Sequence, residues 1–155
     1  MKAPKFKYVR ATSLDEALKL LDQYGEDGRI LAGGQSLMPT LNMRLSQPEV
    51  LIDINRIDEL KGISLDGDTV RIGALTRHVE VLRSDIVKEH LPLIAEAMPH
   101  VAHVAVRNRG TFGGSVADTA LKADAREARA VRILEDGGCT LSGLRASRRE
   151  LVVLG

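Results

Sequence analysis

Short apolar runs and one amphipathic stretch alternate over the first 54 residues, which predicts alternating strands and helices. Residues 6–11 (FKYVRA) and 49–54 (EVLIDI) are compact runs typical of short strands. Between them, apolar side chains recur from residue 14 at the spacing of one helix face. Ser13 precedes this helix with Glu16 three positions later, the pattern of a capping box, and Gly25 is expected to end it.

The same region contains a second strand followed by a second helix. Residues 29–32 (RILA) predict a strand that runs into Gly33 and Gly34. Residues 36–45 have helical spacing, and Pro39 is tolerable because it falls in the first turn. The resulting order of strand, helix, strand, helix and strand predicts a compact α/β lobe.

The pattern changes after residue 55. Residues 62–75 are two alternating runs around Asp66-Gly67-Asp68, which predicts a β-hairpin. The expected elements that follow are helices at 76–90 and 91–102, a glycine-rich loop at 106–118, a helix at 120–134, and short strands at 137–143 and 148–155. We therefore expect an α+β fold of two lobes, residues 1–57 and 58–155.

Composition narrows the possible functions. The 155 residues carry 22 basic and 21 acidic side chains, a net charge of +1, which does not favour nucleic acid or a membrane surface as partner. Only four residues are aromatic, so a base-stacking surface is not expected. No apolar run is long enough for a membrane span, and the basic start lacks the apolar core of a signal peptide. The single cysteine fits a reducing, cytoplasmic setting and cannot ligate an iron–sulfur cluster alone.

Two glycine pairs are each followed by a serine near the expected start of a helix. The first glycine corner is residues 32–36 (AGGQS), and the second glycine corner is residues 111–115 (TFGGS). Consecutive glycines adopt positive φ at little cost, so their N–H groups can converge on an anion, and a helix start adds further donors. The spacing matches neither a Rossmann fingerprint nor a P-loop. Each pair alone is also compatible with an ordinary turn.

Together, the segments LAGGQSLMPTLNMRL (31–45) and VRNRGTFGGSVAD (106–118) resemble the FAD-binding subunit of the molybdenum hydroxylases. That family includes xanthine dehydrogenase and the medium subunit of aerobic carbon monoxide dehydrogenase. The segment VRIGALTRHVEV (70–81) and the opening FKYVRATSLDEALKLL (6–21) resemble it too. The resemblance extends from about residue 4 to about residue 145.

The resemblance implies that FAD lies between an N-terminal lobe and an incomplete middle lobe, with its diphosphate on the two glycine corners. Asp124 falls where the family places a carboxylate for a ribose hydroxyl, although an exposed charge on a helix face is the other interpretation. Phe112 and Leu121 depart from the family's isoleucine and proline. The residues expected to bind FAD are Leu31, Ala32, Gly33, Gly34, Gln35, Ser36, Leu37, Thr111, Gly113, Gly114, Ser115 and Asp124.

The resemblance also implies an oxidoreductase assembly. FAD would receive electrons from [2Fe–2S] clusters on a small subunit, supplied in turn by a molybdopterin-binding large subunit, and would pass them to NAD or another acceptor. No protein acid or base is expected to be catalytic, because the flavin carries the chemistry. The family's C-terminal lobe is expected to be absent. The alternative is a non-catalytic remnant or a small nucleotide- or anion-binding module.

Other candidate residues have weaker support. His100 and His103 are expected on one helical face, but no third ligand follows at useful spacing, so a metal site is not favoured. His78 is interpreted as a residue at the start of a helix, with an approach to the flavin as the alternative. Arg107 and Arg109 are candidates for pairing with a phosphate or for solvated loop positions.

Overall fold

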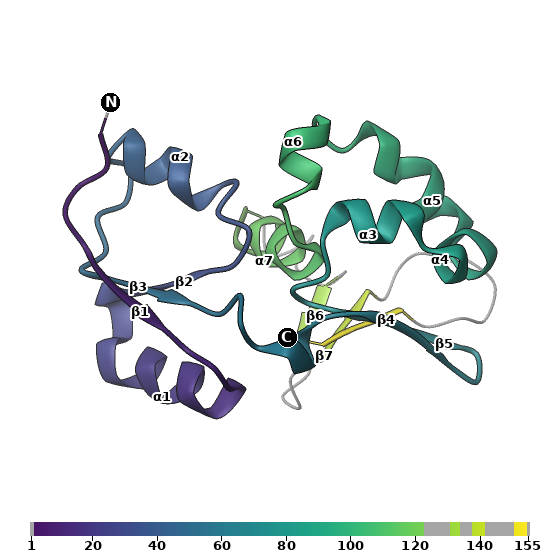
Figure 1. The fold of residues 1–155 in the computed structure, drawn as a ribbon, viewed down its shortest axis with the longest axis horizontal. Coiled ribbons are helices and arrows are strands. Elements are labelled where there is room, and N and C mark those ends of the chain that lie inside the picture. The colour runs from purple at the N-terminus through teal and green to yellow at the C-terminus, as the bar shows by residue number, and fades with distance from the viewer. Residues whose placement is uncertain (1, 123–130, 134–137, 142–150, 155) are drawn as a thin grey trace. The chain divides into compact units, whose positions relative to one another are not determined.

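The computed structural model describes residues 2–122, 131–133, 138–141 and 151–154, with side chains up to residue 118. The chain divides into two compact units, Met1–Asp58 and Glu59–Gly155. Each unit contains helices and its own small sheet (Figure 1), so the expected α+β fold is confirmed. Among the described residues, no helix combines the length and the apolar character that crossing a bilayer requires.

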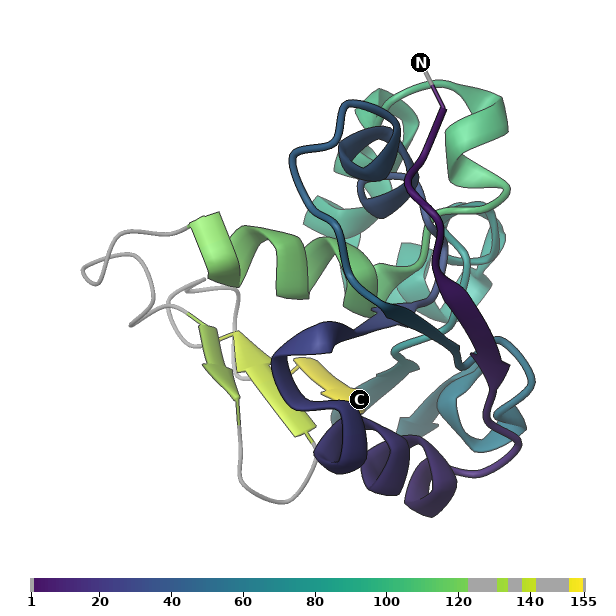
Figure 2. The ribbon, with the colours of Figure 1, turned by 90° about the vertical axis from the view of Figure 1, so that its left-hand side faces the viewer.

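The first unit is built on a three-stranded parallel sheet in the order β1-β3-β2. Its strands are β1 (Lys7–Arg10), β2 (Gly28–Leu31) and β3 (Val50–Asp53). Every residue of the central strand β3 is buried, which fits a strand with a neighbour on each side and a helix on each face. The helices α1 (Leu14–Tyr24) and α2 (Leu37–Asn42) lie on opposite sides of this sheet in both ribbon views (Figures 1 and 2).

Local capping explains the ends of α1. The Ser13 hydroxyl accepts a hydrogen bond from the Glu16 N–H at 3.2 Å, as predicted. The Glu16 carboxylate reaches back to the N–H of Thr12 at 2.8 Å, one residue earlier than in a capping box. Gly25 ends the helix with a φ of 48°, which favours glycine. A short 3₁₀ turn, η1 (Gly25–Asp27), then leads into β2.

The second unit contains a five-stranded mixed sheet in the order β4-β5-β8-β7-β6. The predicted hairpin is confirmed as an antiparallel pair, β4 (Ile63–Asp66) and β5 (Thr69–Gly73), preceded by η2 (Asp58–Leu60). The remaining strands are β6 (Val131–Ile133), β7 (Gly138–Leu141) and β8 (Leu151–Leu154). β8 pairs parallel to β5 and antiparallel to β7.

The helices of the second unit are α3 (His78–Arg83), α4 (Asp85–His90), α5 (Pro92–Ala97), α6 (Val104–Arg107) and α7 (Phe112–Lys122), with η3 (Met98–His100) after α5. α3 to α6 lie on one side of the β4–β5 hairpin (Figure 1). A buried apolar cluster holds these elements together, made of Val70, Ile72, Val81, Val87, Met98 and Phe112. It draws side chains from β5, α3, α4, η3 and the start of α7, so the segment that carries the second glycine corner belongs to this core.

Three predicted elements are wrong in extent or type. The single helix expected at 76–90 is two helices, because Ser84 has extended backbone and its hydroxyl caps α4 through the Val87 N–H at 3.3 Å. The expected glycine-rich loop at 106–118 is helical from Phe112 onward. Within the helix expected at 120–134, residues 120–122 form the end of α7, whereas residues 131–133 form the strand β6 and pair with β7. Strand pairing therefore outweighs the helical composition at residues 131–133.

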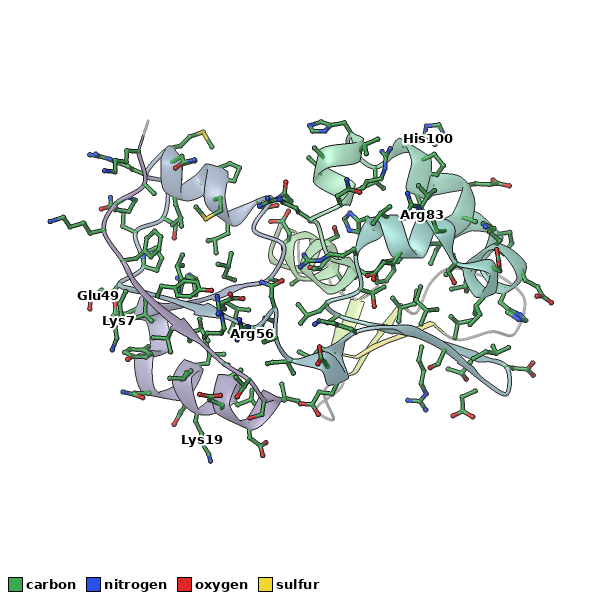
Figure 3. All side chains as sticks on the ribbon, viewed as in Figure 1. Lys7, Lys19, Glu49, Arg56, Arg83 and His100 are labelled. Atoms are coloured by element: carbon green, nitrogen blue, oxygen red, sulfur yellow. The ribbon has the colours of Figure 1, made fainter. Side chains whose placement is uncertain are left out.

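The expected helical face with His100 and His103 is also wrong. His100 ends η3, and His103 precedes α6 with extended backbone. Between them, Val101 is extended and Ala102 has a φ of 49°, so no continuous helix joins the two histidines. Both are exposed, and His100 lies at the surface of its unit (Figure 3).

Candidate functional site: two glycine corners

The first glycine corner leaves the carboxyl-terminal edge of the parallel sheet. Leu31 at the end of β2 is in register with Asp53 at the end of β3, and Asp53 is also in register with Arg10 at the end of β1. In open parallel sheets, this edge is where ligands generally bind. The corner therefore lies at a position suited to a ligand for topological reasons.

Within this corner, Gly34 is the residue whose conformation requires glycine. Its φ is +69°, and a Cβ there would also lie 3.1 Å from Leu31 Cδ1 and 3.3 Å from Met38 Cγ. Gly33, its neighbour, does not have a positive φ. The corner thus turns at a single glycine and then enters α2.

The backbone N–H groups of residues 33–37 have no hydrogen-bond partner within the described part of the chain. The first internal bond after the turn is from Met38 N–H to the Gly34 carbonyl, at 3.0 Å. The Gln35 side chain bonds back to the Gly33 carbonyl at 3.0 Å, so it uses an acceptor and leaves the amides available. Five successive amide donors are therefore available, and such a run fits a multiply charged anion.

The Asn55 side chain binds the carbonyl groups at the start of this corner, a role that was not predicted from the sequence. Its carboxamide nitrogen lies 2.9 Å from the Ala32 carbonyl and 3.3 Å from the Leu31 carbonyl. The same nitrogen is 2.7 Å from Asp53 Oδ1, which also accepts the Asn55 backbone N–H at 2.9 Å. The carbonyls of Leu31 and Ala32 are thus bonded to Asn55, whereas Asn55 does not bond to the N–H groups of residues 33–37.

Asp53 anchors that arrangement as a buried carboxylate. Tyr8 donates its hydroxyl hydrogen to Asp53 Oδ2, and Arg10 Nε lies 3.5 Å from the same oxygen. Burial alone would raise the pKa of this carboxyl, but the hydrogen bonds from Tyr8, Asn55 and Arg10 outweigh it and hold the pKa below its ordinary value. The anchor is therefore negatively charged at neutral pH. In the sequence, this anchor is indicated only weakly, by an Asp at the end of a buried strand and an Asn two residues later.

The second glycine corner is arranged differently, because its amides are used internally. Phe112 N–H donates to the Thr76 carbonyl and Gly113 N–H to the Ala74 carbonyl, both at 2.9 Å. The remaining two amides bond to Thr111, Gly114 to its hydroxyl at 3.3 Å and Ser115 to its carbonyl at 3.2 Å. The expected convergence of free amides on an anion is therefore not found at residues 112–115.

Close packing explains why glycine occupies positions 113 and 114. A Cβ on Gly113 would lie 2.6 Å from the Cβ of Ala74, 2.8 Å from its Cα and 2.9 Å from its carbonyl oxygen. A Cβ on Gly114 would lie 2.7 Å from the Thr111 hydroxyl oxygen. Both distances are shorter than ordinary contacts, and the one at Gly113 means that the start of α7 can approach Ala74, next to the end of β5, only with glycine at that position. The hydroxyl of Ser115, an exposed residue, lies 3.0 Å from His78 Nε2.

The other candidates have structural roles or lie outside the described residues. The Arg107 guanidinium donates to three carbonyls, those of Pro99, Val101 and Ala102, at 2.8–3.1 Å, so it closes the loop after η3. The Arg109 carbonyl accepts from the Arg77 guanidinium, which ties the loop before α7 to the start of α3. His78 is the first residue of α3, which confirms the helix-start interpretation. Asp124 lies outside the described residues, and among those described no group of three His, Cys, Asp or Glu side chains could hold a metal.

Comparisons with known proteins agree with this architecture. Residues 4–132 match the sequence model of the FAD binding domain in molybdopterin dehydrogenase. The chain is 52% identical over 114 residues to the carbon monoxide dehydrogenase medium chain of Hydrogenophaga pseudoflava. It is 50% identical over 117 residues to the 6-hydroxypseudooxynicotine dehydrogenase complex subunit alpha of Paenarthrobacter nicotinovorans. These matches cover 74% and 76% of this chain and 40% of each relative.

Solved structures show the same relationship. A carbon monoxide dehydrogenase from Hydrogenophaga pseudoflava that lacks the Mo-pyranopterin moiety of its molybdenum cofactor matches with a TM-score of 0.79 and 43% identity. That match covers 98% of this chain and 52% of the solved chain. Quinoline 2-oxidoreductase from Pseudomonas putida 86 matches with a TM-score of 0.75 and 39% identity, over 84% of this chain and 45% of that one. The chain therefore belongs to the family of FAD-binding domains of molybdopterin dehydrogenases.

Proposed function

We propose that this chain is the FAD-binding part of the medium subunit of a molybdenum-containing hydroxylase or dehydrogenase. The observation that carries the proposal is the run of five amide donors at residues 33–37, which lies inside the region that matches the family. An FAD diphosphate presents several anionic oxygens close together. Amides held in advance by the sheet and by Asn55 suit such a group because little ordering is needed on binding.

In this proposal the two corners contribute in different ways. The first corner, Leu31 to Leu37, supplies backbone amides. The second corner, Thr111 with Gly113, Gly114 and Ser115, would complete the site, and its glycine at 113 lets the start of α7 lie against Ala74. Asp124 remains our candidate for a ribose hydroxyl.

FAD, when bound, supplies redox chemistry that protein side chains lack, since its ring accepts and releases electrons. The residues of this chain would bind and orient the cofactor. We propose that electrons reach FAD from iron–sulfur clusters on a small partner subunit, which are served by a molybdopterin-binding large subunit, and leave to NAD or another acceptor. We further propose a cytoplasmic location. The relatives that support this assembly are themselves named as subunits or medium chains.

The first test is an equilibrium titration of the purified chain with FAD, followed by flavin fluorescence and absorbance. We expect saturable binding to the wild-type chain. Gly34→Ala should weaken binding by roughly tenfold or more, because a Cβ strains the positive φ and disturbs the run of amides.

Gly25→Ala provides the matched control in the same unit. Gly25 also has a positive φ, of 48°, but a Cβ there meets nothing within 4 Å and lies outside the corner. The control should lose a similar amount of stability and keep its FAD affinity. A folded wild-type chain that does not bind FAD would overturn the proposed function, as would equal loss of affinity in both variants.

A further inference from the structure

Asp53 places a negative charge next to the first glycine corner, where the proposed function requires an anion to bind. Asp53 ends β3 in register with Leu31, which ends β2 and leads into the corner. Only the Asn55 carboxamide nitrogen separates Asp53 Oδ1, at 2.7 Å, from the Ala32 carbonyl oxygen, at 2.9 Å. At such a separation a carboxylate repels a phosphate group, so this anchor works against anion binding at residues 33–37 unless its charge is compensated.

Arg10 brings a positive charge to the same carboxylate. It ends β1, on the other side of β3, and is also in register with Asp53. Its Nε lies 3.5 Å from Asp53 Oδ2, and its Nη2 donates to the Tyr8 hydroxyl at 3.0 Å. The Tyr8 hydroxyl donates in turn to Asp53 Oδ2. Arg10 therefore acts on the carboxylate both directly and through Tyr8.

Burial makes this compensation necessary. Asp53 is 7% exposed, whereas the Arg10 side chain is 41% exposed and lies over the Tyr8 ring, with its guanidinium carbon 5.5 Å from the ring centroid. Burial raises the pKa of the Asp53 carboxyl, but its hydrogen bonds outweigh that effect and hold the pKa below its ordinary value. Without Arg10, the carboxylate would keep its bonds with Tyr8 and Asn55, but its charge would be uncompensated.

The other cation of the same strand has a neutral partner. Lys7 begins β1, and its Nζ lies 3.0 Å from the Tyr24 hydroxyl and 5.5 Å from the centroid of that ring (Figure 3). Lys7 and Arg10 thus both lie over a tyrosine of the first unit, but only the Arg10 contact includes the anchor carboxylate. This pair of residues provides a matched comparison of two positive charges at the two ends of one strand.

We propose that Arg10 is a positioning residue that cancels the negative charge of Asp53, so that the amides of residues 33–37 can bind the phosphate groups of the ligand. Asp53 serves as the acceptor that orients Asn55, and Arg10 removes the electrostatic penalty of having a carboxylate there. The proposal rests on the proposed FAD-binding function for the identity of the ligand. The coupling of Arg10 to Asp53 is tested without any ligand.

The first experiment measures the titration of the Asp53 carboxyl by ¹³C NMR in the ligand-free chain, with Asp53→Asn used for assignment. Arg10→Gln should raise the pKa of Asp53, because the neighbouring positive charge is lost. Lys7→Gln should leave that pKa unchanged. An Asp53 pKa that Arg10→Gln does not raise would overturn the proposal.

The second experiment compares affinities for FAD and for inorganic pyrophosphate in a buffer of low ionic strength. Arg10→Gln should weaken the binding of both by roughly three- to tenfold, and the loss should shrink as salt is added. Arg10→Lys, which keeps the charge, should retain most of the affinity, and Lys7→Gln should retain all of it. Arg10→Met, which keeps the packing on the Tyr8 ring, replaces Arg10→Gln if that variant does not fold.

The double variant Arg10→Gln with Asp53→Asn separates charge from structure. The new carboxamide can still accept from Asn55 and donate to Tyr8, and no net charge remains in the cluster. Affinity for both ligands should therefore return toward that of the wild-type chain. A double variant that binds as weakly as Arg10→Gln, or an Arg10→Gln variant with unchanged affinity, would overturn the proposal. A wild-type chain that binds neither ligand would overturn the proposed function, while the Asp53 titration would still decide whether Arg10 compensates the carboxylate.

Discussion

In the first glycine corner, the N–H groups of residues 33–37 have no partner among the described residues, whereas in the second the N–H groups of residues 112–115 are all bonded internally. Gly34 is needed for its positive φ, and Gly113 for its close contact with Ala74. Two sequences that look alike therefore use glycine for different physical reasons. One gives the backbone a turn that exposes donors, and the other lets a helix pack against a strand end.

The comparison predicts that substitutions at the second corner damage the fold more than those at the first. Gly113→Ala should have the largest effect, about 3 kcal/mol of lost stability, because the new Cβ meets the backbone as well as the side chain of Ala74. Denaturant unfolding monitored by circular dichroism measures this loss. Ala74→Gly in the same chain should relieve only part of it, since the Cα and carbonyl contacts remain.

Gly114→Ala sharpens this prediction. Its Cβ meets the Thr111 hydroxyl at 2.7 Å, and the next atom is 4.0 Å away. Rotation of the hydroxyl can relieve the contact at the cost of one capping hydrogen bond, so the loss should be about 1 kcal/mol. Equal losses in Gly113→Ala and Gly114→Ala would contradict the packing explanation.

Asn55→Ala tests the anchor of the first corner. The substitution leaves the carbonyls of Leu31 and Ala32 and one oxygen of Asp53 without this partner, which should cost about 2 kcal/mol. FAD affinity should fall as well, because the corner becomes less ordered before binding. Loss of stability with unchanged affinity would show that the anchor serves the fold alone.

Lowering the pH should reduce the stability of the two units at different pH values. We expect this change in stability to be the smallest of the effects predicted. Burial lowers the folded pKa of His78, so the unfolded chain binds the proton first and stability falls as pH drops below about 6.5. The lowered pKa of Asp53 stabilises the first unit above its ordinary pKa of about 4, and this contribution is lost as pH falls further.

Urea unfolding at several pH values measures both contributions. His78→Gln should flatten the change between about pH 7 and pH 5 while leaving the more acidic change in place. Asp53→Asn should remove the acidic change instead. A profile that His78→Gln does not alter would contradict the burial of a neutral ring.

Local signals in the sequence predicted the elements that local physics controls. Ser13 and Gly25 mark the two ends of α1 as expected, and Asp66-Gly67-Asp68 marks the hairpin. Ser84 carried a capping signal that the continuous apolar spacing of 76–90 obscured. The glycines of the second corner lie in a helix because Thr111 caps it and Ala74 packs against it. The spacing of glycines along the sequence does not predict tertiary packing of this kind.

The anchor of the first corner could not be predicted from local patterns. Asp53 and Asn55 act on Leu31 and Ala32 because β3 lies between β1 and β2 in a parallel sheet. That strand order brings together residues more than 20 positions apart in the chain. His78 was identifiable as a helix start, but its contact with Ser115 depends on the bridge between Arg77 and Thr111.

Amide NMR of the ¹⁵N-labelled chain during titration with FAD, and separately with inorganic pyrophosphate, tests the central claim most directly. We predict that the amide signals of residues 33–37 shift strongly and become protected from exchange in both titrations, because these donors acquire an acceptor. The amides of residues 112–115, already bonded, should keep their protection throughout. Saturable FAD binding that leaves the signals of residues 33–37 unchanged would contradict the account.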